Sequence, residues 1–202
     1  MSNAMLFKPK DNGEFIFNMF GDYTYLTEGY YKSLDAELRG INIRPTTEEA
    51  LDAYVVPLAM EKARLYGIAV PENEIITEKI TPPVLAYPIN PYTSKFEVVS
   101  DSDNLKSKLN TVTMSGKYPS LCQKLPEDYR IDIIRCFLGK TLLKEYEEFA
   151  ANIFKAFHIP LMKIRVIVTS SHYLFSAIEP LIFDELTLKE KKIIEELGTW
   201  QR

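Results

Sequence analysis

One stretch of the chain, residues 15–45, constrains the fold more than any other. It opens with the apolar residues Phe15, Ile16 and Phe17, continues through a loop rich in hydroxyl groups, and then carries apolar residues at helical spacing over residues 28–39. Gly40 stands where a left-handed residue commonly ends a helix, and residues 41–44 return as a strand. The pattern predicts a βαβ-like unit whose polar loop lies at the carboxyl end of the first strand.

That loop is the first candidate binding region. Asn18, Tyr23, Tyr25 and Thr27 are expected to offer polar groups to a ligand there. Neither GxGxxG nor GxxxxGK[ST] occurs in the chain, so the sequence does not support a dinucleotide site or a P-loop. The alternative is structural: the loop packs its tyrosines and caps the helix that follows.

Composition limits the class of protein. The chain has 202 residues, of which 46% are hydrophobic, which suits one medium domain or two small lobes with a substantial core. Residues 1–4 precede a second methionine and are interpreted as a cloning scar. No apolar run reaches the roughly 18 residues that a membrane span needs, and no signal peptide is evident, so we expect a cytoplasmic protein without a membrane partner.

Charge and cysteine content exclude further classes. A net charge of −4 argues against a nucleic-acid partner. Two cysteines and two histidines are too few for a zinc cage or a disulfide framework, so Cys122 and Cys136 are predicted to be buried thiols. Ser170, Ser171 and His172 are adjacent in sequence and are interpreted as a turn, because a hydrolase triad draws its members from different elements.

The rest of the chain predicts an α/β (α+β) protein in which a small βαβ-like N-terminal unit, residues 5–52, precedes a mixed-sheet body, residues 53–202. Thr46 with Glu49 and Thr187 with Glu190 have the spacing of capping boxes. Asp101 and Asp103 are also interpreted as helix caps, and His158 is expected to end a helix and bind its last carbonyls. Helices are predicted over residues 57–66, 101–112, 142–157 and 187–197, and strands over residues 84–89, 96–99, 119–125, 129–137, 163–169 and 173–178.

Alternation within two of these strands suggests a basic surface. Ile131 and Ile133 are expected on one face of their strand, with Arg130 and Asp132 on the other. Residues 163–169 are expected to turn Ile164, Val166 and Val168 inward and Lys163, Arg165 and Thr169 outward, toward a cleft or water. Four cations would then meet an anionic ligand, or form a solvated face, and Asp132 would form a local ion pair; these cations are Arg130, Arg135, Lys163 and Arg165.

Position-specific residues in the first stretch carry a family resemblance. These residues are Asn18, Tyr23-Thr24-Tyr25, Gly29-Tyr30-Tyr31, Ser33, Ala36-Glu37, Arg39-Gly40 and Pro45. Through them the chain resembles the RimK-like ATP-grasp N-terminal domain family, found ahead of peptide-forming ligases. The resemblance extends to Phe137-Leu138-Gly139, Ile159-Pro160-Leu161 and Ile178-Glu179-Pro180. Residues 61–71 are similar to the helix and turn that begin the nucleotide-clasping lobe of ATP-grasp ligases.

The ligase resemblance implies chemistry that this chain only partly retains. ATP-grasp ligases phosphorylate a carboxylate and need a lysine beneath the phosphates and acidic or amide oxygens for magnesium. At the matching places the chain has Tyr87, then Arg165, then Ala177 with Glu179. ATP is therefore the implied cofactor, Glu179 is the remaining candidate ligand residue, and magnesium is not expected to be tightly held. No catalytic residue can be assigned.

Three functions remain open at this point. The first is a pseudoenzyme of peptide modification, which binds an anionic nucleotide, amino acid or peptide or supports a catalytic ATP-grasp domain or protein. The second is an active ATP-dependent carboxylate–amine ligase. The third is an oligomerisation or partner-interaction domain, for which a homodimer would bury exposed aromatic residues.

Overall fold

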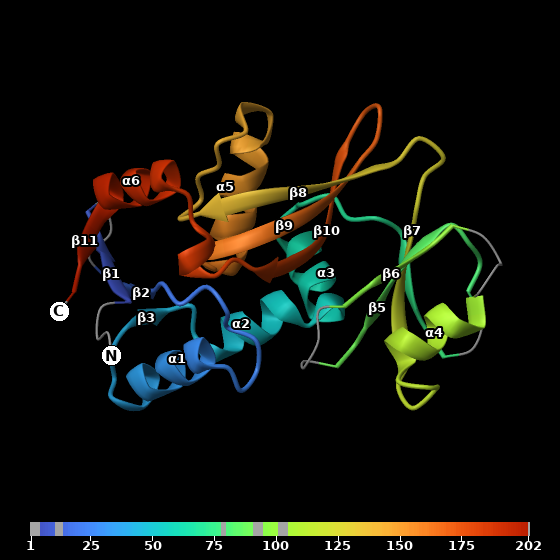
Figure 1. Ribbon diagram of the computed structural model, residues 1–202, viewed down its shortest axis with the longest axis horizontal. Helices are drawn as coiled ribbons and strands as arrows, with labels where there is room; N and C mark the ends of the chain where they lie inside the picture. Colours follow the sequence, from blue (N-terminus) through green and yellow to red (C-terminus); the bar gives the residue numbers. More distant parts are fainter. Residues whose placement is uncertain (1–4, 11–13, 78–79, 91–94, 101–104, 202) are drawn as a thin grey trace.

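The computed structural model describes residues 5–10, 14–77, 80–90, 95–100 and 105–201, and it arranges three sheets along the long axis of the molecule (Figure 1). We call them the N-terminal sheet (order β11-β1-β2-β3), the central sheet (β10-β9-β8) and the lateral sheet (β4-β7-β5-β6). The strands are β1 (Leu6–Pro9), β2 (Ile16–Asn18), β3 (Ile43–Arg44), β4 (Asn73–Ile76), β5 (Val84–Pro88), β6 (Glu97–Val99), β7 (Ser120–Lys124), β8 (Arg130–Phe137), β9 (Leu161–Val168), β10 (Tyr173–Pro180) and β11 (Gly198–Trp200).

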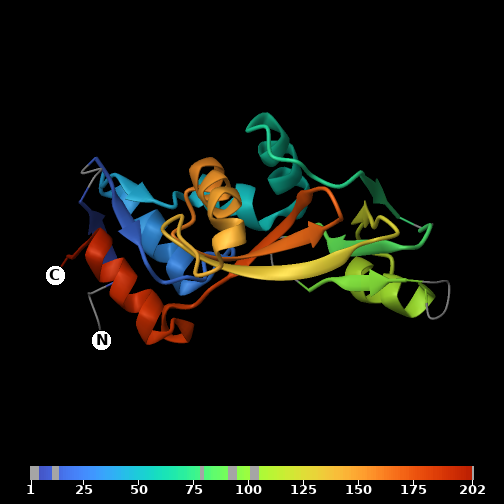
Figure 2. The same ribbon diagram turned by 90° about the horizontal axis from the view of Figure 1, so that it is seen from above.

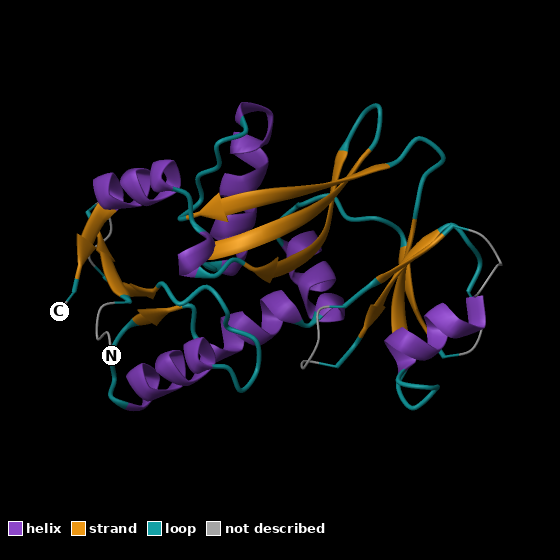
Figure 3. Ribbon diagram, in the orientation of Figure 1, coloured by secondary structure: helices purple, strands orange, loops and turns teal. Residues whose placement is uncertain are grey.

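Helices pack around these sheets, and the mixed α/β class that the sequence predicts is confirmed (Figure 3). No described helix is long and apolar enough to cross a membrane. The predicted caps at Asp101 and Asp103 lie outside the described residues. The helices are α1 (Glu28–Leu38), α2 (Thr47–Tyr54), α3 (Val56–Leu65), α4 (Leu105–Thr113), α5 (Glu147–Phe157) and α6 (Leu188–Leu197), with short 3₁₀ turns η1 (Lys144–Tyr146) and η2 (Phe183–Glu185).

The N-terminal sheet contains the predicted βαβ unit. Strands β2 and β3 are parallel, with Ile16 opposite Ile43, and α1 connects them. Two strands that the sequence did not reveal extend this sheet: β1 pairs with β2, and β11 pairs with β1, so that Phe7 lies opposite Trp200. The final helix α6 ends before Gly198, as predicted. The chain then continues as strand β11, which adds the C-terminal residues to the N-terminal sheet.

Local signals set the helix boundaries. Both predicted capping boxes form: the side chain of Thr46 accepts a hydrogen bond from the backbone of Glu49, and that of Thr187 accepts one from the backbone of Glu190. Pro57 lies in the first turn of α3 and starts a fresh helix. Helix α5 begins at Glu147, later than predicted, because the 3₁₀ turn η1 occupies the residues before it.

The central sheet has two chemically different faces. On one face α5 packs against Ile134 and Cys136, and both residues are fully buried. The predicted alternation of β8 is confirmed: Arg130 and Asp132 share the face that α5 covers, where Asp132 bonds Tyr146, and Ile131 and Ile133 lie on the other face, where Ile133 is 52% exposed. Helix α5 covers the even-numbered positions of the strand. The other face, with the odd-numbered residues of β8 and β9, carries the candidate site.

Candidate functional site

Arg165 lies in the interior of the protein. It was predicted to point outward from β9, but its side chain is only 1% exposed. The lateral sheet covers this end of β9, so the guanidinium carbon lies 3.5 Å from the ring centroid of Phe96 and 5.6 Å from that of Tyr87. The alternation of β9 therefore predicted correctly that Lys163 and Arg165 share a face, but it was wrong that Arg165 is exposed, because the lateral sheet covers that face at Arg165.

A directional chain of hydrogen bonds extends from Arg165 through both sheets. One guanidinium nitrogen of Arg165 donates to the hydroxyl of Tyr87 at 2.9 Å, and this hydroxyl lies 2.7 Å from the hydroxyl of Ser176. Ser176 donates to the side-chain carbonyl of Gln123 at 2.6 Å, and the Gln123 amide donates back to the Ser176 carbonyl at 2.8 Å. The other terminal guanidinium nitrogen forms an ion pair with Glu179. We call these five side chains the Arg165 network.

Burial shapes the chemistry of this network. Burial raises the pKa of the Tyr87 hydroxyl, and the neighbouring Arg165 charge opposes the rise only in part. The hydroxyl is thus neutral at ordinary pH and can both accept from Arg165 and donate to Ser176. A buried charge is costly unless it is paired, and Glu179 supplies the compensating charge here. The network therefore contains a charged Arg165–Glu179 ion pair whose net charge is zero, and this pair lies between the two sheets.

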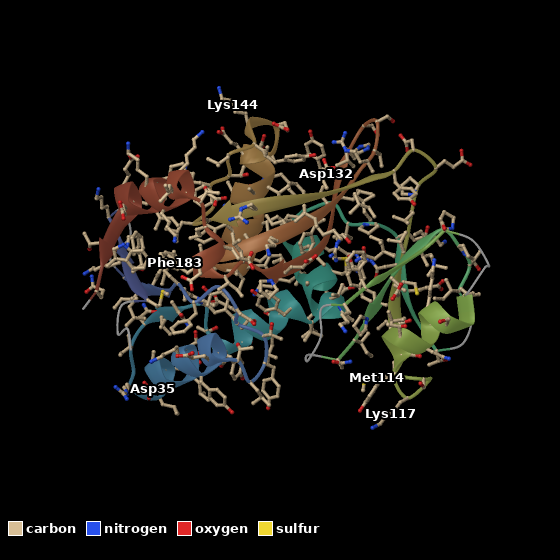
Figure 4. The ribbon with its side chains drawn as sticks, in the orientation of Figure 1. Asp35, Met114, Lys117, Asp132, Lys144 and Phe183 are labelled. Carbon is tan, nitrogen blue, oxygen red and sulfur yellow. The ribbon has the colours of Figure 1, made fainter. Side chains whose placement is uncertain are left out.

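A row of charged residues continues along the same face. Arg135, Lys163 and Glu179 lie opposite one another on β8, β9 and β10. Arg135 forms two hydrogen bonds of 2.8 Å with the carboxylate of Glu190, which is buried, and Lys163 pairs with Glu185 at 2.6 Å. Phe183, labelled in Figure 4, lies in η2, where the chain passes from the central sheet to α6. The turn η2 brings Glu185 to the row, and α6 brings Glu190.

Arg130 belongs to the opposite face of the central sheet. Its guanidinium binds Asp132 through bonds of 2.9 and 2.7 Å, which confirms the predicted local ion pair, and Asp132 lies at the upper side of the sheet in Figure 4. Tyr146 also bonds Asp132, and burial followed by this bond raises the pKa of Tyr146 to about 12. Arg130 therefore does not join Arg165, although the sequence grouped the two.

The candidate residues of the N-terminal loop use their polar groups within their own unit. The amide nitrogen of Asn18 donates to the carbonyl of Gly29 at 2.8 Å, and the Tyr23 hydroxyl donates to the carbonyl of Asn18 at 2.5 Å. Thr27 caps α1, and Tyr25 packs edge-on against a tyrosine of that helix at 5.2 Å. These contacts are those of the structural alternative, in which the loop packs and caps the helix.

The structure also tests three further sequence interpretations. The sequence 170–172 forms the hairpin turn between β9 and β10, as predicted, with the Ser171 hydroxyl 2.6 Å from a ring nitrogen of His172. His158 ends α5 in a left-handed conformation, as expected, but its ring binds the carboxylate of Glu49 at 2.8 Å and not the helix carbonyls. Cys122 and Cys136 are buried free thiols.

The site thus contains residues that the sequence did not point to. Gln123 and Ser176 are polar residues inside otherwise apolar strands, a signal that could have marked them as partners of a buried polar group. Glu185 and Glu190 gave no such signal, since the capping box already accounted for Glu190. Of the nine candidate residues, the structure gathers four on one face, namely Arg135, Lys163, Arg165 and Glu179.

The arrangement of the three sheets is that of ATP-grasp ligases. The D-alanine-D-alanine ligase of Helicobacter pylori matches with a TM-score of 0.60 and 15% identity, over 82% of this chain and 67% of that one. A RimK domain ATP-grasp protein of Sphaerobacter thermophilus matches with a TM-score of 0.57 and 12% identity, over 83% and 72%. An L-amino acid ligase of Bacillus licheniformis matches with a TM-score of 0.54 and 10% identity, over 77% and 47%. At these identities the likeness shows the fold alone.

The family follows from the sequence itself. The model of the RimK-like ATPgrasp N-terminal domain matches residues 6–197, so the chain belongs to this family. The comparison with curated proteins returned no match. The family and the ATP-grasp ligase-like fold, both expected from the sequence, are therefore confirmed.

The residues of the Arg165 network do not fit the magnesium ion that the ligase fold implies. Glu179 is the one carboxylate of the network, and its charge is already neutralised by the Arg165 guanidinium. That guanidinium would also repel a divalent cation. Elsewhere in the described ranges, no group of three or more histidine, cysteine, aspartate or glutamate side chains could hold a metal ion.

Proposed function

We propose that this chain is a non-catalytic domain of the ATP-grasp system, which supports a carboxylate–amine ligase without itself carrying out the phosphorylation step. The observation that carries the proposal is the buried pair of Arg165 and Glu179 on the face of the central sheet. ATP-grasp chemistry needs a lysine near the phosphates and oxygen ligands for the metal. The family resemblance places Tyr87 where that lysine is expected and Arg165 where an acidic ligand is expected.

Related structures give the contrast. One neighbour is a D-alanine-D-alanine ligase of Bacillus anthracis complexed with ATP, and another is the ATP-grasp ligase PsnB complexed with magnesium, ADP and a precursor variant. In this chain the three cations Arg135, Lys163 and Arg165 each have a carboxylate of the same chain within ion-pair distance. A nucleotide phosphate would have to displace one of these carboxylates, which disfavours turnover and favours a supporting role.

A second role for the same site is the binding of an anionic nucleotide, amino acid or peptide. The Nε atom of Arg165 is buried and has no hydrogen-bond partner within the described part of the chain. A carboxylate or phosphate can engage two guanidinium donors at once, whereas Glu179 engages one. An anion that replaced Glu179 could therefore satisfy the remaining donor as well.

An ADP-release assay tests the absence of catalysis. The chain is incubated with ATP, Mg²⁺ and either single amino acids or short acidic peptides, and a D-alanine-D-alanine ligase serves as the positive control. We expect the rate of ADP release with the protein to equal the rate in a control that contains no protein. Amine-dependent ADP release that survives repurification and is lost in Arg165→Met would contradict the proposal.

Calorimetry tests the binding role. ATP without metal and acidic peptides are titrated up to millimolar concentration into the wild type, Arg165→Met and Arg39→Met. The last variant is a matched control, because Arg39 pairs with Asp35 on the exposed side of α1. Binding that Arg165→Met alone abolishes supports the role, and equal binding by all three proteins refutes it.

A further inference from the structure

The outer edge of β8 is a feature that the ligase-like fold leaves unexplained. Strand β8 is an edge of the central sheet, because it pairs with β9 alone (Figure 2, where β8 is the strand of this sheet nearest the viewer). Two bonds at the end of the strand show which residues of β8 bond β9. The backbone N–H of Leu138 donates to the carbonyl of Pro160 at 2.7 Å, whereas Phe137 exchanges backbone hydrogen bonds with Lys140 on the side away from β9. Bonded and non-bonded positions alternate in an antiparallel pair. The backbone groups of Ile131, Ile133 and Arg135 therefore point away from β9.

Other sheet edges in the described chain are short or covered. Edge strands β3, β4, β6 and β11 have two to four residues each. The second long edge, β10, is interrupted by a register shift between Phe175 and Ala177, and the N–H of Phe175 is bonded to the carbonyl of Ala69 at 2.8 Å. Strand β8 is eight residues long, and its register with β9 is regular throughout.

The usual protection of an exposed edge is missing from β8. Proteins commonly protect such edges with unpaired charged side chains, above all lysine, with proline or with a bulge. Strand β8 contains none of these, and its arginines are bound to carboxylates of the same chain, Arg130 to Asp132 and Arg135 to Glu190. The middle of the strand presents Ile133, whose side chain is half exposed. An edge of this kind is suited to pairing with another strand.

We propose that β8 pairs with β8 of a second copy of this chain, antiparallel and about a two-fold axis at Ile133, which joins the two central sheets. The free edge runs from Arg130 to Cys136, since the bond to Lys140 closes it at Phe137, and Ile133 is its midpoint. A symmetric pair uses the same patch on both subunits. Every outward backbone group of the free edge then finds a partner.

This register is also the one that the side chains favour. Ile133 lies against its own copy, and Ile131 lies opposite Arg135 of the second copy, whose hydrocarbon stem can cover it. Asp132 lies opposite Ile134. Moving the axis by one residue, to Asp132, would set two aspartates directly opposite each other, which is destabilising. The outward backbone groups of Ile131, Ile133 and Arg135 are symmetric about Ile133, the exposed apolar residue at the axis, so a second copy pairs the whole edge and is the occupant that we infer.

The first experiment compares two exposed isoleucines on edge strands. Light scattering after size exclusion is measured over a concentration series for the wild type, Ile133→Lys and Ile75→Lys; Ile75 is 58% exposed on β4 and is the matched control. We expect the wild type and Ile75→Lys to have twice the mass of the chain, and Ile133→Lys to have the mass of one chain at the same concentrations. Circular dichroism checks that all three proteins are folded.

A second experiment fixes the register. Directly opposite residues of an antiparallel pair have Cα atoms about 5.5 Å apart or closer, within the range of a disulfide. Ile133→Cys should form a covalent dimer under mild oxidation, and Ile75→Cys should not, while the two native thiols stay buried. A monomeric wild type would overturn the proposal. So would a dimer that survives Ile133→Lys, or one in which Ile133→Cys does not cross-link.

Discussion

Replacing Glu179 by glutamine probes the Arg165 network directly. The substitution keeps an acceptor oxygen and the shape of the side chain but leaves the buried guanidinium without its charge partner. Removing one partner of a buried pair costs about 3–5 kcal/mol. Glu179 is 22% exposed, whereas Arg165 is 1% exposed, so water can compensate part of the loss. We therefore expect the free energy of unfolding to fall by about 2–4 kcal/mol.

The matched control is Asp35→Asn, which removes the carboxylate of an exposed pair with Arg39. The two side chains are 56% and 69% exposed, so the expected loss is below about 0.5 kcal/mol. Urea unfolding followed by circular dichroism measures both variants, with the slope of each transition compared to the wild type. A double variant, Arg165→Met with Glu179→Met, should recover much of the stability that Glu179→Gln loses. The reasoning is refuted if Glu179→Gln costs no more than Asp35→Asn.

Three further results are expected. Burial raises the pKa of Glu190, but its bonds to arginine and threonine outweigh this, so the net pKa lies below the usual value; its stabilisation is complete above about pH 4.5 and is lost as the pH falls through the lower folded pKa. Glu190→Gln should flatten the acid side of a stability–pH curve. Burial raises the pKa of Cys122 to about 11 and of Cys136 to about 12, so a thiol reagent should label them only after denaturation. Gly21→Ala should cost several times more in thermal melting than Gly67→Ala, because both have positive φ but only Gly21 faces a carbonyl oxygen 1.9 Å from the added carbon.

Local patterns in the sequence predicted the elements of the fold well. Both capping boxes and the turn at residues 170–172 depend on residues close together in the sequence, and each was confirmed. The βαβ unit was confirmed as well, although its strands pair across a whole helix, with Ile16 opposite Ile43. Strand β11 was not predicted, because Gly198–Trp200 is three residues long, directly follows a helix, and is a strand through its pairing with β1. The boundary between residues 52 and 53 remains a prediction.

The candidate site was harder to predict, because its partners are far apart in the sequence. The β9 alternation placed Lys163 and Arg165 on one face, as observed, but no local pattern indicates that the lateral sheet covers Arg165 while Lys163 stays partly exposed. The bond between Tyr87 and Ser176 joins residues 89 positions apart. Arg130 was grouped with Arg165 on the strength of charge alone, although its even-numbered position in β8 places it on the face opposite Arg135 and Arg165.

The ion pairs within the chain determine how readily an external anion can bind the face of the central sheet that carries Arg135, Lys163 and Arg165. A carboxylate of the same chain binds each of Arg135, Lys163 and Arg165, so an external anion must compete with a tethered one. A tethered competitor acts at a high effective concentration, which lowers the apparent affinity of any free ligand. Competition is weaker at Arg165 than at Arg135, because Glu179 engages only one nitrogen of Arg165 and the Arg165 Nε has no partner in the described chain. An anion should therefore exchange with Glu179 before it displaces Glu190 from Arg135, because Glu190 binds two nitrogens of that guanidinium.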